Sequence, residues 1–117
     1  MNKHIYKIAT VEQWKKAKAD GLFRGAPIDL ADGYIHFSTV DQVRETAAKH
    51  FAGQEDLLLL TIEAALLGEA LRYEASRGGA LFPHLYADLQ IEAVVRVDRL
   101  PVGNDGNHVF PQDLAGA

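Results

Sequence analysis

The feature that most constrains the fold is the apolar stretch Leu-Leu-Leu-Leu-Thr-Ile at residues 57–62. Its longest purely apolar run, residues 57–60, is far shorter than the ~20 residues that a membrane span requires. A strand whose successive residues are all apolar is typical of the centre of a sheet that is covered on both faces. We therefore expect this stretch to form a central strand.

Two capping boxes predict helices in the first half of the chain. In this motif the side chain of a threonine accepts a hydrogen bond from a free helix amide, and a glutamine three residues later reaches back. Thr10 with Gln13 predicts a helix that ends near residues 20–21, and Thr39 with Gln42 predicts a second one. Between these helices, residues 25–33 are rich in turn-forming side chains, and we expect a loop there.

Strand patterns occupy most of the remaining domain, at residues 4–8, 34–37, 71–75 and 90–98. In the last of these, alternate apolar residues predict an inward row: Ile91, Ala93, Val95 and Val97. The predicted helices lie in the first half of the chain and most of the strands in the second half. This order differs from the regular alternation of strands and helices in a doubly wound fold. We expect one compact α+β domain over residues 1–100, with two main helices and a mixed or mostly antiparallel sheet. Residues 101–117 are expected to be a surface tail.

Composition excludes several classes of function. The chain has no cysteine, which rules out disulfides, thiolate zinc sites and a cysteine nucleophile. Its histidines lack the spacing of a metal site, so we expect no metal. A formal charge of −4 argues against nucleic acid as a partner and favours a small-molecule ligand. No signal peptide or membrane segment is evident, which fits a cytoplasmic location. The sequence does not predict the oligomeric state.

The segment at residues 34–38 is the first candidate site. Strand geometry places Ile35 and Phe37 on one face and Tyr34, His36 and Ser38 on the other. Because Ser38 precedes a predicted helix, the polar face lies beside free amides, which suit an anion or a ribose hydroxyl. The alternative is structural: Ser38 or Thr39 caps the helix, and His36 pairs with a backbone carbonyl.

A second candidate segment follows Pro83. If the chain is extended there, His84 and Tyr86 point the same way, which is a common way to present ligand contacts on a loop. Glu74 lies on the polar side of the preceding strand, where it could orient a histidine, bind a hydroxyl or act as a base. In the alternative, His84 is solvated and Glu74 belongs to a surface ion pair. Lys7 on the first strand is open to both interpretations.

These residues also carry a family resemblance. The chain resembles the small, mostly bacterial proteins grouped as domain of unknown function 952, over residues 5–98. The hallmarks of that family stand here as Ile5-Tyr6, Trp14, Gly21-Leu22-Phe23, Gly33-Tyr34-Ile35-His36-Phe37-Ser38, Gln42, Asp56-Leu57, Glu74 and Phe82-Pro83-His84-Leu85-Tyr86. One position departs from the pattern: Lys7 stands where the family often has a histidine.

The first half of the chain is similar, more distantly, to the ADP-ribosyltransferase fold and its RNA 2′-phosphotransferases. That resemblance implies a nicotinamide–ribose pocket lined by His36 and Ser38, with Glu74 as the catalytic carboxylate. NAD would then be a substrate, and no cofactor would be required. The first-strand His-Gly-Thr motif of those enzymes is replaced here by Lys-Ile-Ala at residues 7–9.

Two functions therefore stay open. One is an enzyme that processes NAD or a nucleotide ribose, or a degenerate relative of such an enzyme. The other is a non-catalytic module that binds a small metabolite through the same histidine, glutamate and tyrosine side chains. Whether the chain is an enzyme is not predicted.

Overall fold

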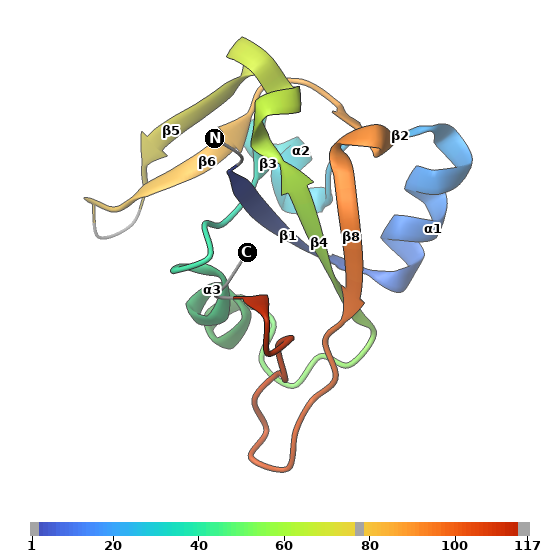
Figure 1. Cartoon of the computed structure of the whole chain (residues 1–117), viewed down its shortest axis with the longest axis vertical. Helices are drawn as coiled ribbons and strands as arrows, with labels where there is room; N and C mark the ends of the chain where they lie inside the picture. The colour runs from blue at the N-terminus through green and yellow to red at the C-terminus, as the bar shows by residue number, and fades with distance from the viewer. Residues whose placement is uncertain (1–2, 77–78, 115–117) are drawn as a thin grey trace.

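The apolar stretch forms the middle of a three-stranded antiparallel sheet. In the computed structural model, which describes residues 3–76 and 79–114, it is strand β4 (Leu57–Glu63). Its neighbours are β1 (His4–Thr10) and β8 (Val94–Arg99), as Figure 1 shows. Every β4 residue except Glu63 is buried. The prediction of a central strand covered on both faces is confirmed.

Helix α1 (Val11–Asp20) begins at the first capping box. The Thr10 hydroxyl accepts a hydrogen bond from the Gln13 amide at 3.0 Å, and the Gln13 side chain accepts one from the Thr10 amide at 2.9 Å. Gly21 ends the helix with φ 83°, a left-handed conformation that glycine adopts without strain. Both predicted ends of this helix are confirmed.

Helix α3 (Val43–His50) begins later than its capping box predicts. The Gln42 side chain does accept a hydrogen bond from the Thr39 amide, at 3.0 Å, but residues 39–42 form a turn before the helix. A further short helix, α2 (Pro27–Asp32), lies in the stretch expected to be a loop. Its start is stabilised by a proline in the first turn and by the Asp29 carboxylate, which accepts a hydrogen bond from the Ala26 amide at 2.7 Å.

The central sheet buries a separate apolar cluster on each face. On one face Leu60 packs in a cluster with Trp14 of α1. On the other face Leu59 packs in a cluster with Val43 of α3 and with Leu114. The α1 and α3 helices therefore cover opposite faces of the same three strands (Figure 1).

A second three-stranded sheet, β3-β6-β5, projects beside the first one (Figure 1). Its strands are β3 (Ile35–His36), β6 (Leu81–Leu85) and β5 (Leu71–Ala75). A two-stranded pair is formed by β2 (Leu22–Phe23) and β7 (Leu89–Gln90). Two 3₁₀ segments, η1 (Ala64–Ala70) and η3 (Ile91–Ala93), lead into β5 and β8. All strand pairings in the described residues are antiparallel, as expected for this α+β domain.

The predicted inward row of the last strand is wrong in its second half. Ala93 is buried, but Val95 and Val97 are 52% and 41% exposed. Three features account for this. The 3₁₀ turn interrupts the predicted strand, and the pairing with β4 shifts register between Thr61 and Ile62. In addition, β8 is the edge strand of its sheet, and α1 packs mainly against β1, β2 and β4.

Residues 101–114 lie closer to the domain than a surface tail would. Leu114 is 2% exposed within the α3 cluster, and Phe110 packs against the same cluster. The Arg96 guanidinium donates two hydrogen bonds to the Asp113 carboxylate, at 2.8 and 2.9 Å. Among the described residues, no helix is long and apolar enough to cross a membrane.

Candidate functional site

The pairing of β3 with β6 brings the two candidate segments together. His36 and His84 are Cα partners in this pairing, and their ring centroids are 5.5 Å apart with the rings nearly perpendicular. The Tyr34 ring contacts both imidazoles, at centroid distances of 4.7 Å to His36 and 4.2 Å to His84, and also the Tyr86 ring at 5.2 Å. Four aromatic side chains from two segments that are far apart in the sequence thus form one cluster.

Glu74 holds one side of this cluster. Its Oε1 atom accepts a hydrogen bond from His84 Nδ1 at 2.8 Å and another from the Tyr86 hydroxyl at 2.7 Å. Antiparallel pairing explains the approach, because β5 and β6 are neighbours and Glu74 lies diagonally across from His84. Arg72 lies over the Tyr86 ring, 5.2 Å from its centroid.

These contacts fix the charge of the Glu74 carboxyl. The hydrogen bonds from His84 and then from Tyr86 lower the pKa of Glu74 below its ordinary value. The same Glu74 contact raises the pKa of the Tyr86 phenol. Glu74 therefore carries its negative charge near neutral pH. It is suited to stabilising positive charge and poorly suited to donating a proton.

Asp29, which the sequence analysis did not single out, holds the other side of the cluster. Its carboxylate accepts a hydrogen bond from His36 Nδ1 at 2.6 Å and one from the His36 amide at 3.0 Å. The Lys7 ammonium donates to both of its oxygens, at 3.0 and 2.8 Å. The Asp29 side chain is only 1% exposed, and that of Lys7 is 7% exposed. Lys7 thus reaches the cluster through Asp29.

The pKa of Asp29 reflects a competition between burial and its partners. Burial raises the pKa, but the hydrogen bond from His36 and the charge of Lys7 outweigh it and bring the pKa down to about 2. For Lys7 burial is the larger effect, and the pKa of the ammonium is lowered although Asp29 opposes the change. Asp29 is therefore an anion throughout the neutral range.

His36 is held at both ring nitrogens. Asp29 accepts from Nδ1, while Nε2 lies 2.9 Å from the Asp32 carboxylate, a half-exposed group on the last turn of α2. The Nδ1 contact is a hydrogen bond to Asp29, whereas the Nε2 contact is an ion pair only when the imidazole is protonated. A ligand would have to displace Asp32 to reach His36 Nε2.

Ser38 lies apart from the other predicted residues. After Phe37 the backbone leaves β6 and bridges to Tyr6 of β1, with 2.8 Å hydrogen bonds in both directions. The buried Ser38 hydroxyl forms a 2.9 Å hydrogen bond with Thr46 of α3. The structure therefore brings together Tyr34, His36, Glu74, His84 and Tyr86, adds Lys7 through Asp29, and places Ser38 against α3.

A shallow hollow of about 290 Å³ opens beside the tyrosines. Tyr34, Tyr86, Leu30, Arg24 and Asp88 are among the residues that line it, together with Asp29. Its volume lies just below the range of about 300–1,000 Å³ that is usual for small-molecule sites. The tyrosines belong to its lining, whereas His36, Glu74 and His84 do not. In residues 3–76 and 79–114 no group of three or more histidine and acidic side chains is arranged to hold a metal ion.

Comparison with known proteins agrees with this architecture. A family model described as "Protein of unknown function (DUF952)" matches residues 8–97. The chain belongs to the DUF952 family. The resemblance to this family, which the sequence motifs indicated, is thereby confirmed. Apart from Lys7, every site residue discussed above lies within the matched DUF952 region.

The DUF952 chain is also similar to solved structures of protein CC0527 from Caulobacter crescentus. The X-ray structure of that protein has a TM-score of 0.91 and 51% sequence identity, with 96% of this chain and 98% of the other covered. Its solution NMR structure has a TM-score of 0.82 and 50% identity, with 97% and 96% covered. No curated protein gives a significant match.

Proposed function

We propose that this DUF952 protein processes a nucleotide ribose, with NAD as a substrate, in the manner of an ADP-ribosyltransferase. The observation that carries the proposal is the Glu74 carboxylate, which is fixed by His84 and Tyr86 at the edge of an aromatic cluster. Breaking the bond between the ribose anomeric carbon and nicotinamide leaves positive charge on the sugar. A fixed anion beside that carbon stabilises the developing charge.

The reaction makes limited demands on the side chains. The electron pair of the broken bond leaves with nicotinamide, which becomes neutral. Water or an acceptor hydroxyl then forms the new bond to the anomeric carbon and releases its proton to solvent. Glu74 keeps its charge throughout, which agrees with its lowered pKa. In this proposal His36 binds a ribose hydroxyl once Asp32 is displaced, and Tyr86 stacks on the ligand or hydrogen-bonds to it.

The order of elements supports the proposal further. The order is a first strand, a capped helix, Gly21-Leu22 and then a short strand that ends at His36 and is followed by Phe37-Ser38, which is similar to the order in the ADP-ribosyltransferase resemblance. The Lys-Ile-Ala sequence at residues 7–9 departs from the His-Gly-Thr motif of the RNA 2′-phosphotransferases. Lys7 is committed to Asp29 in this structure, so its role is to hold the network behind His36.

The test combines binding and turnover. NAD is titrated to millimolar concentration while the imidazole signals of His36 and His84 are followed by NMR, and nicotinamide release is measured separately. Glu74→Gln should abolish release and leave the NAD-induced shifts in place. Glu69→Gln, an exposed glutamate on η1, is the matched control and should change neither. If millimolar NAD changes no chemical shift of the His36 or His84 imidazole, the proposal is wrong.

A second candidate function is a non-catalytic module that binds a small metabolite through the same side chains. The specific observation in its favour is His36, whose two ring nitrogens are already occupied by Asp29 and Asp32. Such an imidazole has no free nitrogen to offer a substrate unless Asp32 moves away. This candidate predicts ligand-induced shifts at His84 with no nicotinamide release from the native protein, and Glu74→Gln then weakens binding only.

A further inference from the structure

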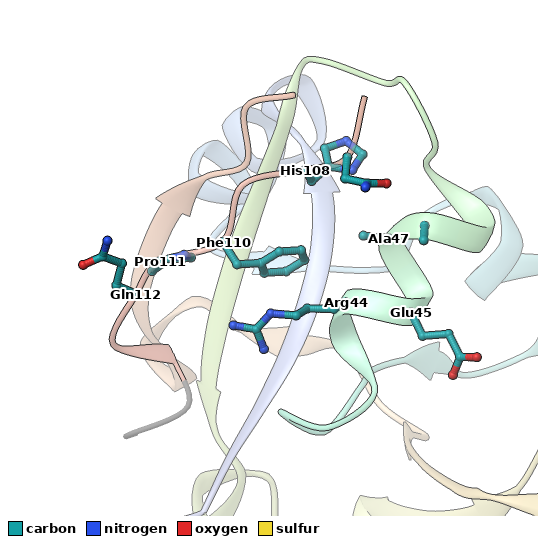
Figure 2. A pocket seen from close by; sticks show the side chains of 9 residues that line it. Arg44, Glu45, Ala47, His108, Phe110, Pro111 and Gln112 are labelled. Carbon is teal, nitrogen blue, oxygen red and sulfur yellow. The ribbon is translucent and has the colours of Figure 1, made fainter. Parts of the chain in front are cut away.

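A second hollow lies between α3 and the segment at residues 107–112. Its volume is about 480 Å³, within the range of small-molecule sites, and it shares no lining residue with the hollow beside the tyrosines. Figure 2 shows its two walls: Arg44, Glu45 and Ala47 on α3, and His108, Phe110 and Pro111 on the other side.

The second wall is anchored at several points. His108 Nε2 donates a hydrogen bond to the Gln54 carbonyl at 2.7 Å, and the Val109 amide donates to the Pro101 carbonyl at 2.8 Å. Beyond the hollow, the Arg96–Asp113 pair and the buried Leu114 tie the segment to the sheet and to the α3 cluster. The second wall is therefore held in place by contacts with the rest of the domain, so a ligand need not order this segment when it binds.

The charges of the lining favour an anion with a single charge. The Arg44 guanidinium lies over the Phe110 ring, 5.2 Å from its centroid, and forms no ion pair with another described residue. Glu45 is the one carboxylate of the lining, and it pairs with Lys49 at 3.2 Å. One free guanidinium matches one carboxylate through two parallel hydrogen bonds. A doubly charged phosphate would lack a second arginine or lysine among the lining residues.

The other lining residues indicate the chemistry of the part of the ligand that does not contact Arg44. Phe110, Pro111, Ala47 and Ala48 provide an apolar wall beside the guanidinium. At the other end of the hollow, His108 donates from Nε2 to a backbone carbonyl, so in the neutral ring Nδ1 is left as an acceptor. From these contacts we infer that this hollow is a binding site for a small monocarboxylate with an apolar body, whose carboxylate is bound by Arg44.

Benzoate is the probe for this site, and benzamide is its neutral counterpart. With the full chain, benzoate should shift the NMR signals of Ala47, Ala48 and the Phe110 ring. Arg44→Gln should weaken benzoate binding about tenfold or more, since a hydrogen-bonded charge is lost, and Arg44→Lys should weaken it less. Arg99→Gln, which removes an exposed arginine of β8, is the matched control and should leave binding unchanged.

Three results would each overturn the inference: no shift at these residues at millimolar benzoate, equal binding of benzamide, or equal weakening by Arg99→Gln. If Arg44→Gln lowers the melting temperature enough to confuse the comparison, benzamide and Arg44→Lys still decide it. The outcome is independent of NAD turnover, because the two hollows share no residue.

Discussion

Lys7 and Asp29 form an ion pair with two hydrogen bonds, and both side chains are almost completely shielded from water. A buried ion pair of this kind adds little over a well-packed apolar pair, but removing one partner leaves the other charge uncompensated. This asymmetry makes the pair a sensitive probe of the network behind His36.

The first prediction concerns the stability of this pair. Lys7→Met should lower the free energy of unfolding by about 3 kcal/mol, because the buried Asp29 carboxylate loses its ammonium partner and the two hydrogen bonds from it. The double variant Lys7→Met/Asp29→Asn removes both charges but keeps a side-chain oxygen as acceptor at position 29, and it should recover part of that loss. Urea denaturation followed by circular dichroism measures both. Lys49→Met, which breaks the exposed pair with Glu45, is the control and should cost less than about 1 kcal/mol. Equal costs for the two lysines would contradict the burial argument.

The second prediction follows from the pKa of Asp29, which falls from 3.8 to about 2 on folding. A carboxyl with a lowered folded-state pKa stabilises the protein above its unfolded pKa, and this contribution is lost as pH falls through the folded value. Between about pH 4 and pH 2 the protein should therefore lose about 2 kcal/mol through Asp29 alone. Asp29→Asn, although less stable at neutral pH, should show a flatter decline over the same interval in acid-dependent urea melts.

The third prediction concerns Glu74 and Tyr86. Their hydrogen bond raises the pKa of the Tyr86 phenol above 10.0 and lowers that of Glu74. Glu74→Gln should consequently bring the pKa of Tyr86 back down, in a pH titration of the phenol ring signals by NMR. Tyr86→Phe should raise the pKa of Glu74 only in part, since the hydrogen bond from His84 remains. An unchanged Tyr86 titration in Glu74→Gln would show that the contact is not formed in solution.

The fourth prediction separates Ser38 from the candidate site. Ser38→Ala removes a buried hydrogen bond to Thr46 and should destabilise the protein by about 1 kcal/mol. Since Ser38 lies against α3, NAD-induced shifts at His84 should be the same in the variant and the native protein. Tyr34→Ala, which removes the ring that contacts both imidazoles, should instead reduce those shifts. A large loss of NAD binding in Ser38→Ala would place the serine in the site after all.

Local patterns predicted the parts of the fold whose signals are short in sequence. The capping box at Thr10, the apolar strand β4 and the alternation of β5 depend on neighbouring residues, so they could be predicted without tertiary information. Helix α2 was not predicted, because Gly25 and Gly33 favoured a loop there more strongly than Pro27 favoured the start of a helix. The exposure of Val95 and Val97 on β8 was not predicted. It depends on a register shift between β8 and β4 and on the fact that α1 packs mainly against other strands.

The candidate site was predicted in part for the same reason. Alternation along a strand indicated that His84 and Tyr86 would share a direction, and the family motifs singled out Glu74. Asp29 gave no comparable signal, because its importance arises only when α2 carries it onto Lys7 and His36. Ser38 was grouped with His36 by strand alternation, but the strand pairing with β6 ends before the serine and the backbone turns towards β1.

The buried position of Leu114 has a practical consequence for anyone who shortens this protein. A fragment cut at the end of the matched family region, residue 97, would lack both Leu100 and Leu114 and would uncover Val43 and Ala47 of α3. Such a fragment should aggregate or self-associate, because the apolar surface that it exposes would bind to other apolar surfaces. Expression trials and domain fusions should therefore keep the chain through at least residue 114.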